Sequence, residues 1–230
     1  RELCYYAALS PHRFQFVFLK QGLHNNPNEL RQRVQEAIDA VDPAECDAIL
    51  LGYGLCSNGL AGVVARSTRL VVMRGHDCIT FLLGSKERYR TYFDAHPGTY
   101  WYSPGWIETT TQPGQERYEA ALRHYIEIYG EENAAYLMEA TENWIHEYNN
   151  AAYVDLGFGD SEAHKAFTRE CAEWLDWQCD FLEGDPGLVR RYVSGDWNPE
   201  DFLVVEPGER IVASYDERVI ATERGSDDGG

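Results

Sequence analysis

Two short and nearly unbroken apolar runs, CDAILLGYG and RLVVMRG, each lead into a glycine-containing turn, and they constrain the fold most. Strands that bury both faces in a parallel sheet are apolar throughout, whereas half-exposed strands alternate. Helical patterns separate such runs along the chain, as in right-handed strand–helix–strand crossovers. The sequence therefore predicts an α/β protein with a mostly parallel, Rossmann-like sheet covered by helices on both faces.

The expected elements are read from periodicity and from start and stop signals. A helix is predicted to start at Asn26, with Pro27 in its first position and Glu29 in its first turn. A longer helical stretch is expected from Gln115 to Tyr148. The other expected strands are LCYYAAL, GTYWYSPGW, AAYVDLGFG, QCDFLEGD and the final pair within DFLVVEPGERIVA. One domain is expected over residues 1–220, with division into lobes 1–110 and 111–220 left open, followed by a disordered tail over residues 221–230.

The acidic composition excludes some partners. The 230 residues include 20 Lys and Arg against 38 Asp and Glu, which gives a net charge of -18. A surface of that sign repels phosphate backbones, so nucleic acid is not expected as a partner. Neither a membrane-spanning apolar run nor a signal peptide is recognised, and a soluble, cytoplasmic protein is therefore expected.

Three of the six cysteines follow or lie within the first three expected strands. Cys4 lies in the first, Cys56 follows the second and Cys78 follows the third. Since ligands of doubly wound sheets bind at the carboxyl ends of the strands, these three thiols are expected to converge. The other cysteines are interpreted as structural, and they are Cys46, Cys171 and Cys179.

Converging thiols next to an imidazole are typical of a site for a soft metal. Cys4, Cys56 and Cys78 are the predicted ligands, with His76 as a fourth ligand or as a turn residue nearby. Zinc is the first expectation and a [4Fe–4S] cluster the alternative, because both accept such a set. Buried structural thiols remain a further interpretation. Asp77 either orients His76 or caps the helix that begins after it, and the cap is favoured.

The glycine-rich stretch GYGLCSNGLAG lacks both the dinucleotide-binding and the phosphate-loop spacing. Gly54 is expected to allow close approach of a ligand to the backbone or to supply left-handed turn geometry, and Ser57 and Asn58 to offer donors to an anion such as a carboxylate. The aromatic residues between positions 100 and 148 either line a pocket or pack in the core, and the core is favoured.

Several segments also resemble one family in order and spacing: GLHNNPNELRQRVQEAID, LLGYGLCSNGLAGV, HDCITFLLGSKERY, HPGTYWYSPGWIE and GDWNPEDFLVVEPGERI. On these segments the chain resembles DUF1638, a family defined without a function. The resemblance implies a context of corrinoid proteins and corrinoid-dependent methyltransferases, near which such proteins are encoded. A metal site serving one-carbon or methyl-transfer chemistry, with a corrinoid supplied by a partner protein, is what this context suggests.

Two other function classes fit the same residues. In a metal-free enzyme, Cys56 or Cys78 would be a nucleophile or a proton-transfer thiol, as in a paired-thiol racemase. In a binding protein without catalysis, the glycine turns and the aromatic segment would hold a small molecule or a partner subunit. Metal content and thiol reactivity distinguish the three classes.

Overall fold

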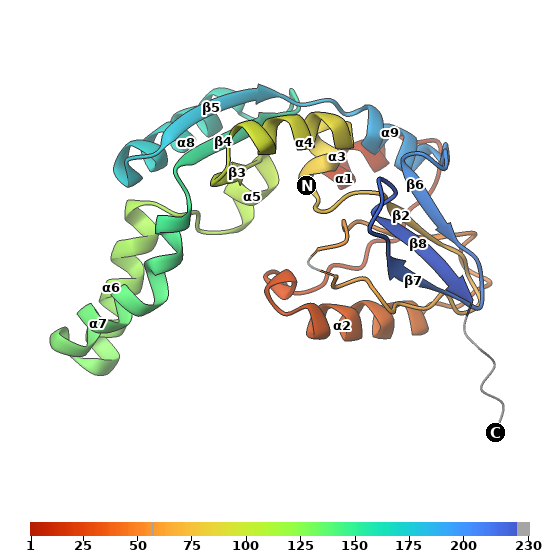
Figure 1. Cartoon of the computed structure of the whole chain (residues 1–230), viewed down its shortest axis with the longest axis horizontal. Helices are drawn as coiled ribbons and strands as arrows, with labels where there is room; N and C mark the ends of the chain where they lie inside the picture. The colour runs from red at the N-terminus through yellow and green to blue at the C-terminus, as the bar shows by residue number, and fades with distance from the viewer. Residues whose placement is uncertain (57, 225–230) are drawn as a thin grey trace. The chain divides into compact units, whose positions relative to one another are not determined.

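The structure, a computed structural model that describes residues 1–56 and 58–224, confirms the α/β class (Figure 1). The described strands form three small sheets, and a single Rossmann-like sheet is not confirmed. The chain divides into two compact units. The inserted unit contains Arg1–Glu2 and Tyr89–Gly184, and the split unit contains Leu3–Arg88 and the residues from Asp185 onward.

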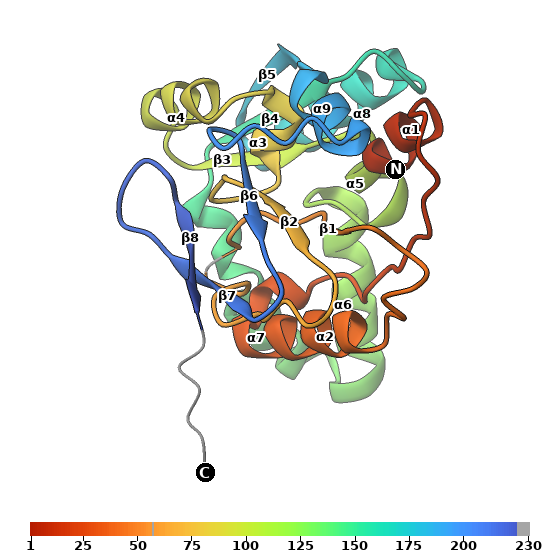
Figure 2. The same ribbon diagram turned by 90° about the vertical axis from the view of Figure 1, so that its right-hand side faces the viewer.

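The sheet of the split unit combines parallel and antiparallel pairing. Strand β1 (Ile49–Leu51) pairs in parallel with β2 (Leu70–Met73), and β6 (Phe202–Val205) pairs with β2 in the antiparallel sense (Figure 2). Strands β7 (Glu209–Ala213) and β8 (Ile220–Arg224) form a separate antiparallel pair. The two strands expected as a final pair therefore each pair with a different partner. Of the expected tail, residues 221–224 belong to β8 and residues 225–230 lie outside the described residues.

The predicted first strand, LCYYAAL, is wrong, because this segment lies in helix α1 (Glu2–Ala8). A seven-residue apolar run fits either state, and the alanines together with Glu2 in the first turn favour a helix. The other helices that lie in or begin in the split unit are η1 (Leu23–Asn25), α2 (Pro27–Asp39), α3 (Ile79–Leu83), α4 (Lys86–Ala95) and α9 (Gly187–Ser194).

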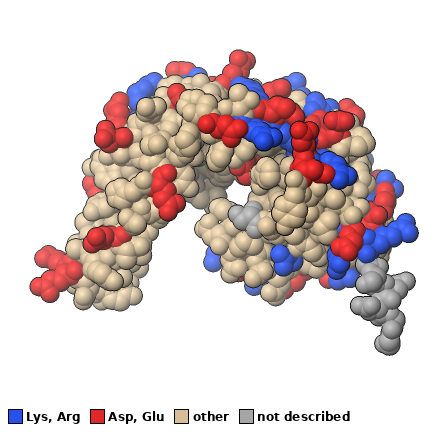
Figure 3. Space-filling model, viewed as in Figure 1, with Lys and Arg blue, Asp and Glu red and all other residues tan. Residues whose placement is uncertain are grey.

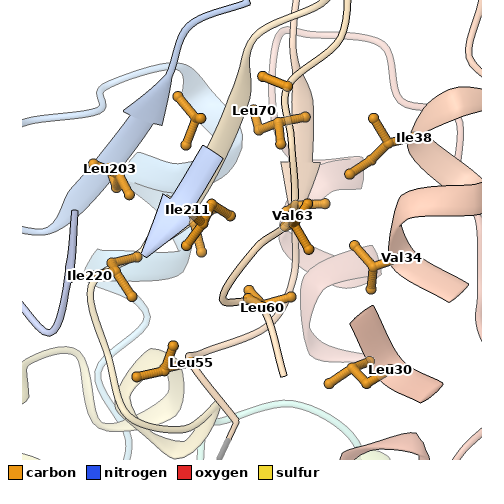
Figure 4. Packing of buried hydrophobic residues seen from close by; sticks show 14 of the residues in the cluster. Leu30, Val34, Ile38, Leu55, Leu60, Val63, Leu70, Leu203, Ile211 and Ile220 are labelled. Atoms are coloured by element: carbon orange, nitrogen blue, oxygen red, sulfur yellow. The ribbon is translucent and has the colours of Figure 1, made fainter. Parts of the chain in front are cut away.

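Helix α2 starts where the sequence predicts and supplies one side of the core. The Asn26 side chain accepts a hydrogen bond from the Glu29 backbone N–H at 3.3 Å, which caps the first turn. Leu30, Val34 and Ile38 recur at the spacing of one helical face and are buried. They point toward residues of the strands and loops, including Leu60, Val63, Leu70 and Ile211 (Figure 4).

Arg74 joins the end of β2 to the C-terminal segments of the split unit. Its side chain is 9% exposed and contacts backbone carbonyls instead of a carboxylate. Nε donates to the oxygens of Pro199 at 2.8 Å and Phe202 at 3.3 Å. Nη1 donates to the oxygens of Arg218 and Ile220. One guanidinium thus holds two separate stretches of chain, residues 199–202 and residues 218–220, against the end of β2.

The inserted unit contains a fully parallel sheet in the order β3-β4-β5, formed by Thr99–Tyr102, Asn150–Asp155 and Gln178–Glu183. Helix α8 (Ser161–Leu175) connects β4 to β5 and packs on both strands. Helix α5 (Pro104–Thr109) follows β3. The expected long helical stretch is confirmed as α6 (Gln115–Tyr129), α7 (Glu131–Glu142) and η2 (Asn143–Glu147). It is broken at Gly130, whose φ of 78° suits glycine.

Aromatic residues of the inserted unit pack against one another. The ring of Tyr100 lies 5.3 Å from that of Tyr148, 6.0 Å from that of Trp144 and 6.0 Å from that of Trp177, measured between centroids. Tilted and edge-on rings at these separations are favourable packing arrangements. This cluster supports the core interpretation of the aromatic segment.

Acidic side chains are distributed over the face of the molecule seen in Figure 3, with fewer basic side chains among them. The pattern agrees with the excess of Asp and Glu in the sequence. Among the described helices, none has the length and apolar composition needed to cross a bilayer.

Candidate thiol site

The loops that follow β1 and β2 run side by side and carry Cys56 and Cys78. The Leu55 N–H donates to the Gly75 oxygen at 2.8 Å, and the Cys56 N–H donates to the His76 oxygen at 2.9 Å. These bonds join the two loops beyond the paired strands, so both loops leave the sheet at the same edge. The structure thus places the two motifs on neighbouring loops, and the convergence of their thiols stays a prediction.

Gly54 allows the two loops to approach each other. A Cβ atom at this position would lie only 2.7 Å from backbone atoms of Asp77, closer than real Cβ contacts. The close approach expected at Gly54 therefore involves the neighbouring loop, and its predicted role toward a ligand stays a prediction.

Cys56 has an unusual backbone and a neutral thiol. Its φ of 47° lies in the left-handed region, which is uncommon for a residue with a Cβ atom. Burial and, after it, the negative charge of Asp77 raise the pKa of Cys56 to about 11, against a smaller lowering by a hydrogen bond from the Gly54 backbone. The thiol therefore keeps its proton at neutral pH.

Tyr53 lies within the electrostatic reach of both thiols. Burial raises the pKa of Tyr53, and negative charge on Cys56 or Cys78 raises it further. A phenol and two thiols thus occupy one region at the carboxyl ends of β1 and β2. Tyr53 was not among the predicted site residues, and its position in GYGLC, three residues before Cys56, is the sequence signal for it.

Cys78 is half-buried and directly precedes α3. The Asp77 carboxylate accepts a hydrogen bond from the Ile79 N–H at 2.9 Å, which forms an Asx-type turn before α3, whose N-cap position is Cys78 and not Asp77. Asp77 therefore has two effects on the site. It fixes the turn that holds Cys78, and its charge opposes ionisation of Cys56.

The remaining predicted ligands are placed differently from the two thiols. Cys4 lies on α1 and not at the end of a strand, while His76 is exposed and contributes its backbone oxygen to the loop pairing. Within residues 1–56 and 58–224, no three His, Cys, Asp or Glu side chains are grouped as ligands of one metal ion. Two thiols supply half of a tetrahedral set, so the described residues alone do not complete the predicted metal site.

Asn58 is held by helix α2, whereas Ser57 lies outside the described residues. The Arg31 guanidinium donates from Nη2 to the backbone carbonyl oxygen of Asn58 at 3.3 Å. The φ angle of Asn58 is 67°. The Arg31 stem lies against Gly62, where an added Cβ would approach Cδ to 3.3 Å. Arg31 thus fixes the chain just after Cys56, and the predicted anion contact of Asn58 stays a prediction.

The other three cysteines lie on other elements than these loops, in line with a structural role. Cys46 precedes β1 at its amino end. Cys171 on α8 is buried in the core of the inserted unit, and Cys179 on β5 packs against the same core. Burial is the first cause that raises the pKa of Cys171 to about 11.

A second polar cluster lies at the carboxyl end of β4. Asp155 accepts hydrogen bonds from the Ser161 hydroxyl at 2.8 Å and from Lys165 Nζ, which lies 2.9 Å away. The buried His164 lies between the Tyr153 hydroxyl at 3.4 Å and Glu108 at 3.4 Å. The signal for this cluster in the sequence is the strand-to-helix turn DLGFGDS, whose first residues were predicted only as the end of a strand.

The raised pKa of Cys56 predicts slow alkylation. A shift from 9.0 to about 11 lowers the thiolate fraction about 100-fold at neutral pH, so Cys56 should react with iodoacetamide about 100-fold more slowly than a thiol of ordinary pKa. Residue-resolved mass spectrometry between about pH 7 and pH 11 measures the rate. Its increase should continue toward pH 11, and a plateau below pH 9 would contradict the shift.

The same shift links ionisation of Cys56 to stability. The unfolded chain releases this proton at a lower pH than the folded chain, so ionisation of Cys56 leaves the free energy of unfolding unchanged below about pH 9. From about pH 9 toward pH 11 the free energy of unfolding decreases, because only the unfolded chain then gains from ionisation.

Comparison with known families gives one match. The model of the DUF1638 family, described as a protein of unknown function, matches residues 18–193. No curated protein and no solved structure matches the chain.

Proposed function

Because the chain belongs to the DUF1638 family, which has no assigned activity, we propose a function from the chemistry of the thiol site itself. Cys56 and Cys78 are a pair of acid–base thiols that act on a small molecule with an acidic carbon–hydrogen bond. The observation that carries the proposal is the neutral thiol of Cys56, which has a pKa of about 11 and lies on a loop paired with that of Cys78.

A neutral thiol suits the role of proton donor. For a substrate between the two sulfurs, the Cys78 thiolate would remove the proton from carbon and become a thiol. Cys56 would deliver its own proton to the opposite face of the carbanion and become a thiolate. The product is the inverted substrate, and the pair is ready for the reverse direction. The high pKa of Cys56 keeps its proton available until negative charge develops beside it.

Exchange of substrate hydrogen with solvent tests this proposal. The protein is incubated in D₂O with a panel of 2-amino and 2-hydroxy acids, and proton NMR follows loss of the signal at the acidic carbon. Cys56→Ser and Cys78→Ser should each slow the exchange at least about 100-fold. Cys46→Ser is the matched control, because Cys46 lies before β1 and away from the paired loops. Exchange that continues at the same rate in Cys56→Ser would rule out the proposed role.

A thiophilic metal ion is the second candidate, favoured by the two sulfur donors on neighbouring loops. We propose Cys56 and Cys78 as its ligands, with zinc first and an iron–sulfur cluster as the alternative. His76, Cys4 or a substrate thiol would have to complete the set. Such a site would serve methyl transfer to a bound thiol, in the corrinoid-linked context that the family resemblance suggests.

Elemental analysis of anaerobically purified protein separates the two candidates. Zinc or iron that is retained by the wild type and Cys46→Ser, but lost from Cys56→Ser and Cys78→Ser, would favour the metal site. Metal content that is equally low in all four proteins, together with thiol-dependent exchange, would favour the acid–base pair.

A further inference from the structure

One stretch of the chain differs in charge from the rest. No Asp or Glu occurs between Leu3 and Asn28, although these two residue types make up 38 of the 230 residues. The same stretch contains Arg13 and Lys20, and Lys20 is one of three lysines in the chain. A local positive charge in so acidic a protein predicts a negatively charged contact surface.

Within this stretch, Phe14–Leu19 has the geometry of a strand without a partner. We call it the phenylalanine segment. The ring of Phe16 stacks on those of Phe14 and Phe18, with centroids 6.1 and 5.8 Å apart, as side chains on one face of an extended chain do. Phe16 is 45%, Val17 64% and Phe18 76% exposed. Within the described part of the chain, the backbone of the phenylalanine segment makes no hydrogen bond.

An exposed apolar strand with unpaired backbone groups is a template for pairing with another strand. Leu19 packs against the core of the split unit, which anchors one end of the phenylalanine segment. The remaining residues present both backbone and aromatic rings to a partner. Such a surface fits an extended strand better than a helix, because only a strand satisfies the row of N–H and C=O groups.

The chain itself has a strand edge of complementary character. Strand β5 is the outer strand of the order β3-β4-β5, and no described strand pairs with its other edge. Asp180 and Glu183 give this strand negative charge, and Phe181 is 38% exposed. Its six residues equal the phenylalanine segment in length.

We propose that the phenylalanine segment of one copy adds as a strand to the outer edge of β5 in a second copy. The basic residues Arg13 and Lys20 flank the added strand, and the acidic residues lie on the receiving strand. Cross-strand pairs of aromatic residues and of opposite charges stabilise a sheet. The contact joins two different surfaces, so the copies assemble into a closed ring or an open chain.

Pairing of two phenylalanine segments with each other is less favourable. In the antiparallel arrangement centred between Phe16 and Val17, Arg13 of each copy would lie opposite Lys20 of the other. Like charges directly opposite one another destabilise a strand pair. Charge complementarity therefore favours β5 over a second phenylalanine segment as the partner.

Two proline variants test the pairing. Val17→Pro and Phe18→Pro are made separately, because neighbouring N–H groups of an extended chain point in opposite directions. The wild type should assemble as its concentration rises, measured by sedimentation and light scattering. At least one proline variant should raise the dissociation constant of the assembly about tenfold or more. Proline lacks the backbone N–H that would donate a hydrogen bond to the neighbouring strand, and its ring hinders the approach of that strand. The fold should tolerate both changes, since the described structure has no hydrogen bond from this backbone to lose.

Tyr215→Ser is the matched control, because Tyr215 is a fully exposed aromatic residue in the turn between β7 and β8 and should not affect assembly. Hydrogen exchange locates the contact: amides in residues 14–19 and in residues 178–183 should both become protected as the protein is concentrated. A wild type that stays monomeric, assembly unchanged in both proline variants, or protection of residues 14–19 without that of residues 178–183 would each overturn the proposal.

Discussion

Arg74→Met is expected to lower the free energy of unfolding of the split unit by about 3 kcal/mol. Methionine preserves much of the buried stem but has no donor, so the carbonyls of Phe202 and Ile220 would lose their bonds to the guanidinium. A buried acceptor left without a partner costs about 1–3 kcal/mol, and two such carbonyls account for the expected loss. Hydrogen exchange of the amides of β2 and β6 at increasing urea concentration measures the difference.

Arg66→Met is the control for this change. Arg66 pairs with Asp39 on the surface, where its side chain is about half exposed, and exposed pairs contribute little. It should change stability by less than about 0.5 kcal/mol. Arg74→Lys should fall between the two, because an ammonium group can reach only some of the carbonyls. A change in Arg74→Met as small as that in Arg66→Met would show that the carbonyl contacts do not hold the C-terminal segments.

Cys56→Gly is expected to abolish the proposed thiol chemistry while raising stability. Glycine adopts the left-handed backbone without steric cost, and the φ of 47° at Cys56 implies a gain of about 1 kcal/mol over a residue with a Cβ atom. Proton exchange on the substrate should fall at least about 100-fold, because no thiol remains. The two effects are measured by urea unfolding and by NMR in D₂O.

Cys56→Ala provides the matched comparison. It removes the same sulfur and retains the Cβ atom, so it should lose the activity equally and gain none of the stability. If Cys56→Gly proves no more stable than Cys56→Ala, the left-handed backbone at this position is not strained. If either variant retains the activity, Cys56 is not the proton donor.

Local patterns predicted local structure well. The apolar run Leu70–Met73, the helix after Cys78 and the cap formed by Asn26 all follow from neighbouring residues. The pairing of distant strands could not be predicted from such local patterns. Strand β6 pairs with β2 although more than a hundred residues separate them, and no residue near either strand specifies that the pairing is antiparallel. Helix α1 was missed for the opposite reason, since so short an apolar run has no reliable period.

The candidate site was predicted in the same partial way. Glycine turns after two parallel strands were sufficient to bring the loops of Cys56 and Cys78 together. Cys4 was placed with them only because its segment was taken for a strand. The acceptors of Arg74 are backbone carbonyls of residues far along the chain. Every residue has such a carbonyl, so the sequence does not indicate which ones Arg74 contacts.

The division of the chain has a consequence for the order of folding. The split unit is built from residues on both sides of the inserted unit, and the central strand β2 receives its neighbour β6 only from the later part. During synthesis, β2 would emerge from the ribosome long before β6, while the continuous segment Tyr89–Gly184 could already form its own sheet. The edge of β2 that awaits β6 would be exposed for that interval, which makes the nascent chain a substrate for chaperones.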